Sequence, residues 1–255
     1  AAIATVIAQV LSAVLVMLLL IRCKADYRID CRNLRITPSI MSKICAIGIP
    51  SALQLAITAF SNMFVQSYIN RFESSCMAGW TACSKVDSFA LLPMMSLSVA
   101  ITTFVGQNLG AGNYERARSG AKSGLLIGLI IMAIVLVPLY IFAPQIVTLF
   151  NKETEVVEFG GLFIRIVAPF YLMFAINQVY SGALRGAGDT RSTMFIMLGS
   201  FVVFRQVYLF AVYKLGGGID AIVLGYPAGW VLCSILLLIY YYRGGWFKKL
   251  QAGIV

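Results

Sequence analysis

Residues 123–142, SGLLIGLIIMAIVLVPLYIF, are the stretch that decides the fold of this chain. They carry no charged side chain, and about 20 apolar residues are what an α-helix needs to cross the hydrocarbon core of a bilayer. Comparable apolar runs lie at 1–21, 51–70, 76–104, 161–184, 194–213 and 221–242. With 60% hydrophobic and only 12% charged residues, the chain is too apolar for a soluble domain of its size. We therefore expect an all-α fold, a polytopic membrane helix bundle of about seven transmembrane helices.

The basic residues behind the net charge of +10 are concentrated in every second loop between the apolar runs. If the loop after the first run is placed in the cytoplasm, 14 basic residues fall on that side of the membrane and three on the other. Such a bias is the positive-inside rule, so it indicates topology rather than a nucleic-acid partner. The sequence thus predicts a multi-pass protein of the cell membrane, surrounded by lipid, with its carboxy terminus in the cytoplasm.

Catalytic and metal-binding patterns are missing from the sequence. There is no histidine, and the six cysteines include no C-x-x-C pair, which argues against a zinc site and against nucleophile systems that need His. We expect no enzyme activity, no metal and no cofactor.

The spacing of the apolar runs indicates a division of the chain. The first run, 1–21, stands apart from the other six. Residues 22–49 form a basic linker in which isoleucines recur near one face of an amphipathic helix. We expect a cytoplasmic linker at 22–49, a six-helix lobe at 50–243 and a cytoplasmic tail at 244–255. Because the chain has no initiating Met and the first run stands apart from the other six, we expect an upstream half of the protein that this sequence does not include.

Two loops on the predicted cytoplasmic side repeat one pattern. GAGN follows the run at 76–104 and GAGD follows the run at 161–184. Glycine permits the left-handed backbone at a helix end, while Asn and Asp cap the next helix. The repetition suggests internal symmetry of the kind found in transporters. Its residues are Gly110, Gly112, Arg185, Gly186, Gly188 and Asp189.

Polar side chains recur at every fourth position through the run at 51–70, namely Gln54, Thr58, Asn62, Gln66 and Asn70. This spacing predicts one polar stripe along a single side of the helix. Such amides either hydrogen-bond to neighbouring helices or line a hydrated path, and we favour the path. Gln178 belongs to a shorter polar pattern in the run at 161–184.

Ionisable side chains inside membrane helices are costly and therefore need partners or a function. Arg205 lies near the middle of its run and needs a carboxylate, backbone carbonyls or water. Lys85 and Asp87 are about 200° apart around their helix, so they cannot pair with each other. A structural ion pair with another helix and a proton or cation site at Asp87, tuned by Lys85, both remain open.

At these residues the chain resembles the multidrug and toxic compound extrusion (MATE) family. The resemblance is carried by residues 1–9 (AAIATVIAQ), 47–54 (IGIPSALQ), 85–112 (KVDSFALLPMMSLSVAITTFVGQNLGAG), 184–191 (LRGAGDTR) and the pair Phe204-Arg205. It implies twelve helices in two six-helix lobes, of which this chain is the last helix of the first lobe, the linker and the second lobe. The amino-terminal lobe is then a missing partner.

The resemblance also implies a function. Members of the family export small organic cations and drugs in exchange for sodium ions or protons. Some members place coupling carboxylates on the helices corresponding here to 51–70 and 161–184, but neither segment holds an acid. The chain is therefore similar to the branch whose coupling acid lies in the first lobe, and Asp87 is the deep carboxylate left in this half. Three alternatives remain: a flippase for lipid-linked precursors or polysaccharides, a membrane-embedded enzyme and a channel subunit.

Overall fold

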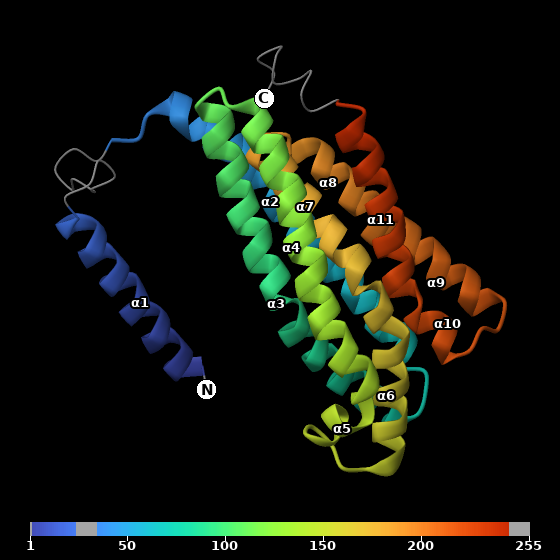
Figure 1. Ribbon diagram of the computed structural model, residues 1–255. Helices are drawn as coiled ribbons and strands as arrows, with labels where there is room; N and C mark the ends of the chain where they lie inside the picture. The colour runs from blue at the N-terminus through green and yellow to red at the C-terminus, as the bar shows by residue number, and fades with distance from the viewer. Residues whose placement is uncertain (1, 24–34, 245–255) are drawn as a thin grey trace. The chain divides into compact units, whose positions relative to one another are not determined.

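The computed structural model describes residues 2–23 and 35–244, and within these ranges all regular structure is helical (Figure 1). The chain divides into two compact units, Ala1–Cys45 and Ala46–Val255. The predicted helical membrane fold is confirmed, because six helices in the described ranges are long and apolar enough to cross a membrane. The first unit adds a shorter apolar helix within α1 (Ala2–Arg22). The part of the predicted linker at 24–34 and the predicted tail at 245–255, with their basic residues, lie outside the described residues.

Of the six membrane helices, the first begins at Pro38 in the first unit and continues into the second unit, and the other five lie in the second unit; three of the six are interrupted. The uninterrupted spans are α2 (Pro38–Ile69), α3 (Ser74–Gly110) and α4 (Tyr114–Ile141), with the short α5 (Ala143–Thr148) after them. The fourth span is α6 (Thr154–Val167), the 3₁₀ turn η1 (Ala168–Phe170) and α7 (Tyr171–Gly186). The fifth is α8 (Thr190–Leu198), the π-helical turn η2 (Gly199–Phe204) and α9 (Arg205–Lys214). The last is α10 (Ile219–Val223) and α11 (Gly225–Tyr242).

The break at η1 has a local cause, and the π-helical turn η2 has a local consequence. Pro169 lies in η1, and a proline has no N–H to donate to the preceding turn, so the α-helical ladder breaks there. The π-helical turn η2 ends directly before Arg205, and such turns change which way the following side chains face. Pro93 lies within α3, which continues as one helix from Ser74 to Gly110.

The predicted linker differs from the structure in one respect. Residues 38–49 are helical, as the isoleucine spacing predicts, but they are continuous with the membrane helix α2 rather than a separate helix. The expected boundary between 49 and 50 therefore falls inside α2. Pro50 does not end the helix there.

The core of the second unit is built around α3, which packs against α4, α6 and α7 (Figure 1). The contact between α3 and α7 is close because small residues face each other. A Cβ added to Gly182 would lie 2.7 Å from the carbonyl oxygen of Ser98. The Ser98 hydroxyl donates to the carbonyl of Gln178 at 2.7 Å, and the Thr102 hydroxyl donates to that of Gly182 at 3.0 Å. Small residues and hydroxyl groups of this kind let membrane helices approach and hydrogen-bond.

The two repeated loops have the same backbone structure. Gly112 has φ of +73° and Gly188 has φ of +82°. In each loop the following residue donates its N–H five residues back, from Asn113 to the carbonyl of Asn108 at 2.7 Å and from Asp189 to that of Leu184 at 2.9 Å. These bonds close the ends of α3 and α7 in Schellman fashion.

The predicted caps of the next helices differ from each other. The Asp189 carboxylate accepts the N–H of Ser192 at 3.4 Å and so caps α8, whereas the Asn113 side chain makes no capping bond to α4. Asp189 also accepts the Tyr240 hydroxyl, which ties the start of α8 to α11. Gly110 and Gly186 are the last residues of α3 and α7. At Gly186 an added Cβ would lie 3.2 Å from the backbone nitrogen of Gly106, so this glycine is also needed for close helix packing.

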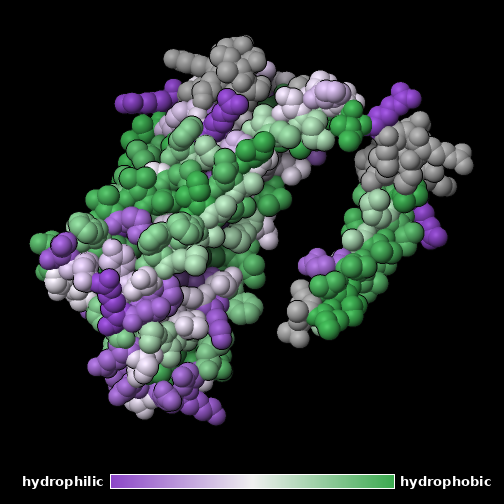
Figure 2. All heavy atoms as spheres, turned by 180° about the vertical axis from the view of Figure 1, so that it is seen from behind, coloured by the Kyte–Doolittle hydropathy of each residue, from purple (hydrophilic) through white to green (hydrophobic). Residues whose placement is uncertain are grey.

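The outer surface of the second unit is largely apolar. Figure 2 shows hydrophobic side chains over much of one face of the bundle, with hydrophilic side chains gathered toward its ends. On α4 the exposed apolar side chains follow one face of the helix. A soluble protein rarely exposes such a surface, so the second unit is that of a multi-pass membrane protein.

Candidate functional site

The polar stripe of α2 passes from the buried side of the helix to its open side. Gln54 is buried and its amide donates to the sulfur of Met197 at 3.1 Å, whereas Asn62 and Asn70 are exposed. The expectation of a single side therefore holds only in part. Four residues turn an α-helix through about 400°, so the stripe rotates by about 160° over its four steps.

The middle of the stripe differs from its buried end. Thr58 and Gln66 are partly exposed, and the Gln66 amide donates to Asn70 at 2.8 Å within the same helix. These side chains therefore do not attach α2 to its neighbours in the way that Gln54 does. Further contacts of α2 with its neighbours come from Asn62 of the stripe, which accepts from Arg205, and from the adjacent buried line of Ser61, Val65 and Ile69.

Arg205, the first residue of α9, connects α9 to α2 through polar contacts. One of its terminal nitrogens donates to the hydroxyl of Ser61 at 2.9 Å and to the amide oxygen of Asn62 at 2.8 Å. Gln206 donates to the Ser61 hydroxyl at 2.9 Å as well. The guanidinium also lies 4.8 Å from the ring centroid of Tyr226. Arg205 is thus buried among neutral oxygens and an aromatic ring rather than beside a carboxylate in the part of the chain that the structure describes.

Asp87 lies inside α3 and accepts a hydrogen bond from the phenol of Tyr171 on α7. Lys85 is exposed, with its Nζ 5.8 Å from the ring centroid of Phe150. The prediction that Lys85 and Asp87 do not pair is consistent with this arrangement. The expected alternative, an ion pair between Asp87 and another helix, does not occur among residues 2–23 and 35–244, where Asp87 has a phenol as its partner.

Aromatic rings of α11 connect the surroundings of Asp87 and Arg205. Tyr226 packs on the Arg205 guanidinium, and the ring of Trp230 lies 6.2 Å from that of Tyr171, the partner of Asp87. Because Tyr226 and Trp230 are four residues apart on one helix, their side chains are neighbours on the same face. We call Asp87, Tyr171, Trp230, Tyr226 and Arg205 the buried polar cluster. It brings one acid and one base from different helices into one aromatic-walled interior without joining them directly.

Gln178 lies in the middle of α7 and Arg185 near its end, and both contact Ser98 of α3. The Arg185 guanidinium donates to the hydroxyl of Ser98 at 2.9 Å, while Gln178 takes part through its carbonyl, which accepts from Ser98. Arg185 also lines a cavity of about 280 Å³ between α2, α3 and α7. The other lining residues are Ser51, Gln54, Leu55, Val99, Thr102 and Thr103. This cavity is the place where the buried end of the stripe is accessible.

Sequence reasoning found the two charged members of the cluster but not their partners. The sequence pattern identifies Tyr171 and Tyr226 as partners only weakly, because tyrosines are common in membrane helices. Only the packing shows which tyrosines face an ionisable group. Ser61 is adjacent to Asn62 but lies outside the four-residue spacing. Within the described ranges no three His, Cys, Asp or Glu side chains come together as metal ligands.

The comparisons with known proteins agree with this architecture. The sequence model of the MatE family matches residues 50–210. The chain is 27% identical to the probable multidrug resistance protein YoeA of Bacillus subtilis over 96% of its own length and 54% of that protein. It is 29% identical to the probable multidrug resistance protein YpnP of the same organism, over 80% of the chain and 45% of YpnP. The chain spans about half the length of the curated relatives it matches.

A solved structure has the same fold. A transporter of the MOP superfamily from Pyrococcus furiosus, described as having a binding pocket of reverse polarity, superposes with a TM-score of 0.88 at 18% identity. The match covers 98% of this chain and 56% of that one. Because the family model matches well over half of the chain and the helical architecture agrees, the chain belongs to the MatE family, the multidrug and toxic compound extrusion transporters.

Proposed function

We propose that the chain forms the carboxy-terminal lobe of an exporter of drugs or small organic cations that works by antiport with sodium ions or protons. The observation that carries the proposal is the pair of Asp87 and Tyr171 inside the membrane helices. A carboxylate that no Lys or Arg side chain neutralises in the described residues can exchange a proton or a cation during a transport cycle. The multidrug resistance names of the relatives support the same function.

The open side of α2 provides a surface suited to varied organic substrates. Asn62 and Gln66 present amides there, and Phe60, Met63 and Phe64 are exposed apolar side chains in the same stretch of the helix. Aromatic and methionine side chains adapt to differently shaped ligands, while amides supply hydrogen bonds without a fixed charge. In the proposed transporter this side of α2 faces the other lobe, and the basic helix ends face the cytoplasm.

The experiment is ethidium efflux from energised vesicles that contain the full-length protein, with the sodium and proton gradients collapsed separately. Efflux that stops with one gradient identifies the coupling ion. In the same vesicles Asp87→Asn is expected to lose most of the gradient-driven efflux, and Tyr171→Phe a part of it. Glu115→Gln is the matched control, because Glu115 is an exposed acid in the first turn of α4. Undiminished efflux by folded Asp87→Asn protein under both gradients contradicts the proposed role of Asp87.

A second candidate is a flippase for lipid-linked precursors or polysaccharides. The specific observation in its favour is that Arg185 lines the 280 Å³ cavity together with hydroxyl side chains, a combination that suits phosphate. Folded protein that shows no ethidium efflux under either gradient, but translocates a fluorescent lipid-linked phosphate, would favour this function over drug export.

A further inference from the structure

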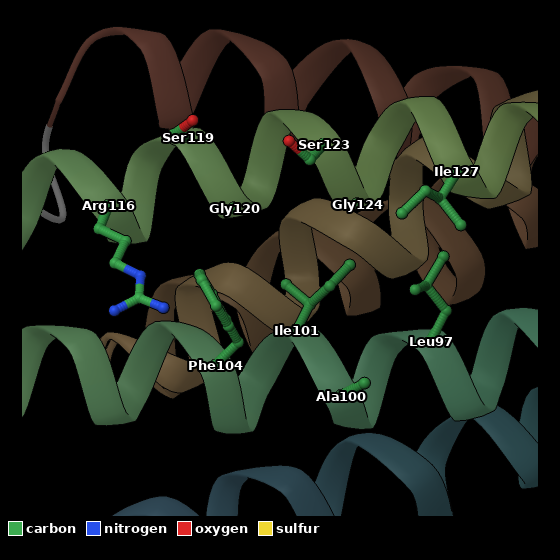
Figure 3. Close-up of a pocket in the computed structure, with 10 residues that line it drawn as sticks. All are labelled: Leu97, Ala100, Ile101, Phe104, Arg116, Ser119, Gly120, Ser123, Gly124 and Ile127. Carbon is green, nitrogen blue, oxygen red and sulfur yellow. The ribbon is translucent and has the colours of Figure 1, made fainter.

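A groove between α3 and α4 lies outside the buried polar cluster and has a different character. Its volume is about 400 Å³, and Figure 3 shows its two walls, one from each helix. Its lining residues are Leu97, Ala100, Ile101 and Phe104 of α3 and Arg116, Ser119, Gly120, Ser123, Gly124 and Ile127 of α4. None of the ten is acidic, and Arg116 is the one with a charge.

Glycines of α4 shape the groove. An added Cβ on Gly120 would collide with the ring of Phe104, and one on Gly124 would lie 2.6 Å from Cδ1 of Ile101. Phe104 and Ile101 therefore pack directly against the backbone of α4 and form an apolar floor, as Figure 3 shows. Because Ala100, Ser119 and Ser123 are small and exposed, the floor stays open to the surface of the second unit.

The length of the groove matches one leaflet of a bilayer. From Arg116 to Ile127 the α-helix rises about 16 Å. Half of a hydrocarbon core about 30 Å thick is about 15 Å. A single acyl chain lying along the groove would thus extend from the polar boundary to the bilayer centre. Leu126, Ile130 and Ile134 of α4 are exposed as well, so the surface of this helix beyond the groove is also apolar.

The charge of the groove is located at one end. Arg116 is exposed in the first turns of α4, with its guanidinium carbon 5.8 Å from the ring centroid of Phe104. In Figure 3 its guanidinium extends across the mouth of the groove toward α3. A guanidinium donates two parallel hydrogen bonds to a phosphate, and the hydroxyl of Ser119 lies one turn further along the same helix.

From these observations we propose that the groove between α3 and α4 is a binding site for one anionic phospholipid. The headgroup phosphate binds Arg116, and one acyl chain lies over Phe104, Ile101 and Leu97. The occupant is a lipid rather than a substrate of transport because the groove lies between two helices long and apolar enough to span a membrane, and none of its lining residues belongs to the buried polar cluster.

The headgroup is tested by native mass spectrometry of the full-length protein in detergent, with phosphatidylglycerol and phosphatidylcholine added separately. Arg116→Gln is expected to lower the affinity for phosphatidylglycerol about ten-fold, because it removes charge-assisted hydrogen bonds. Lys122→Gln is the matched control, since Lys122 is an exposed base of the same helix end that does not line the groove. Salt screens such an exposed charge, so a change of less than about two-fold is expected. An equal loss in both variants would show diffuse attraction of anionic lipid and overturn the site.

The acyl chain is tested with Ala100→Leu, which places a larger apolar side chain in the groove. Its matched control is Ala133→Leu, at an exposed alanine of α4 outside the groove. Weaker binding of both lipids to Ala100→Leu alone, with glycerol phosphate failing to compete, supports a bound diacyl lipid. Unchanged lipid binding in Ala100→Leu, or equal competition by glycerol phosphate, refutes the proposed acyl-chain site. Displacement of phosphatidylglycerol by ethidium would show instead that the groove takes the transported compound.

Discussion

Replacement of Gly182 by alanine tests the contact between α3 and α7 that positions the buried polar cluster. The added methyl group would lie 2.7 Å from the carbonyl oxygen and 2.9 Å from the hydroxyl oxygen of Ser98. The carbonyl belongs to the backbone of α3 and cannot rotate away. The two helices must therefore separate at this point, which also lengthens the bonds that Ser98 and Thr102 donate to α7.

The expected loss of stability follows from these contacts. Overpacking of a tight interface costs about 1–3 kcal/mol. The two interhelical hydrogen bonds contribute about 0.6 kcal/mol each in a membrane protein. Alanine in place of glycine regains about 1 kcal/mol of helix propensity. The net destabilisation of Gly182→Ala is therefore about 1–3 kcal/mol.

The assay is unfolding of the full-length protein in mixed micelles, followed by circular dichroism. Gly48→Ala serves as the control because it lies in α2 and an added Cβ there meets nothing within 4 Å. We expect the control to unfold at or above the denaturant concentration of the unchanged protein and Gly182→Ala well below it. If the two variants unfold together, the close contact between α3 and α7 is not what holds this part of the lobe.

Two further predictions concern α2. Ser61→Ala removes an oxygen that accepts a hydrogen bond from the buried Arg205, so we expect a loss of about 1–3 kcal/mol of folding free energy. Thermal unfolding measures this loss, and Ser67→Ala, at an exposed position of the same helix, is the neutral control. Equal stability of the two serine variants would contradict the role of Ser61. Gln66→Leu is expected to change the relative efflux of different drugs at unchanged protein stability, because the Gln66 amide forms its hydrogen bond within α2. Gln54→Leu, in contrast, breaks a contact with α8 and should lower the stability of the protein. An unchanged drug profile in Gln66→Leu would show that this part of the stripe does not line the substrate path.

Much of the candidate site was visible as single residues in the sequence. Asp87 and Arg205 stand out because a charge within an apolar run is energetically costly unless it has a partner or a function. The glycines of the repeated loops are recognisable because few other residues adopt positive φ, and Gly112 and Gly188 do so. The side of α2 on which each stripe residue lies was less predictable. A four-residue spacing differs from the period of the helix by about 40° per step, so the two ends of the stripe face different environments.

The partners of these residues depend on the tertiary structure. Tyr171 lies 84 positions from Asp87, and Ser61 lies 144 positions from Arg205. No local pattern encodes such a separation, because it results from the packing of several helices at once.

The sequence by itself determined the class of this protein, the number and approximate limits of its membrane helices, and its resemblance to the MATE family. These properties depend on the sum of local transfer free energies and on short turn signals, both of which are read along the chain. Only the tertiary structure decided that Asp87 is bonded to a phenol rather than to a base, that Arg205 connects α9 to α2, and that α3 and α4 leave an apolar groove with a guanidinium at its mouth. The physical reason is that these features depend on the interhelical distances set by small residues such as Gly182 and Gly120, whose effect appears only when another helix lies against them.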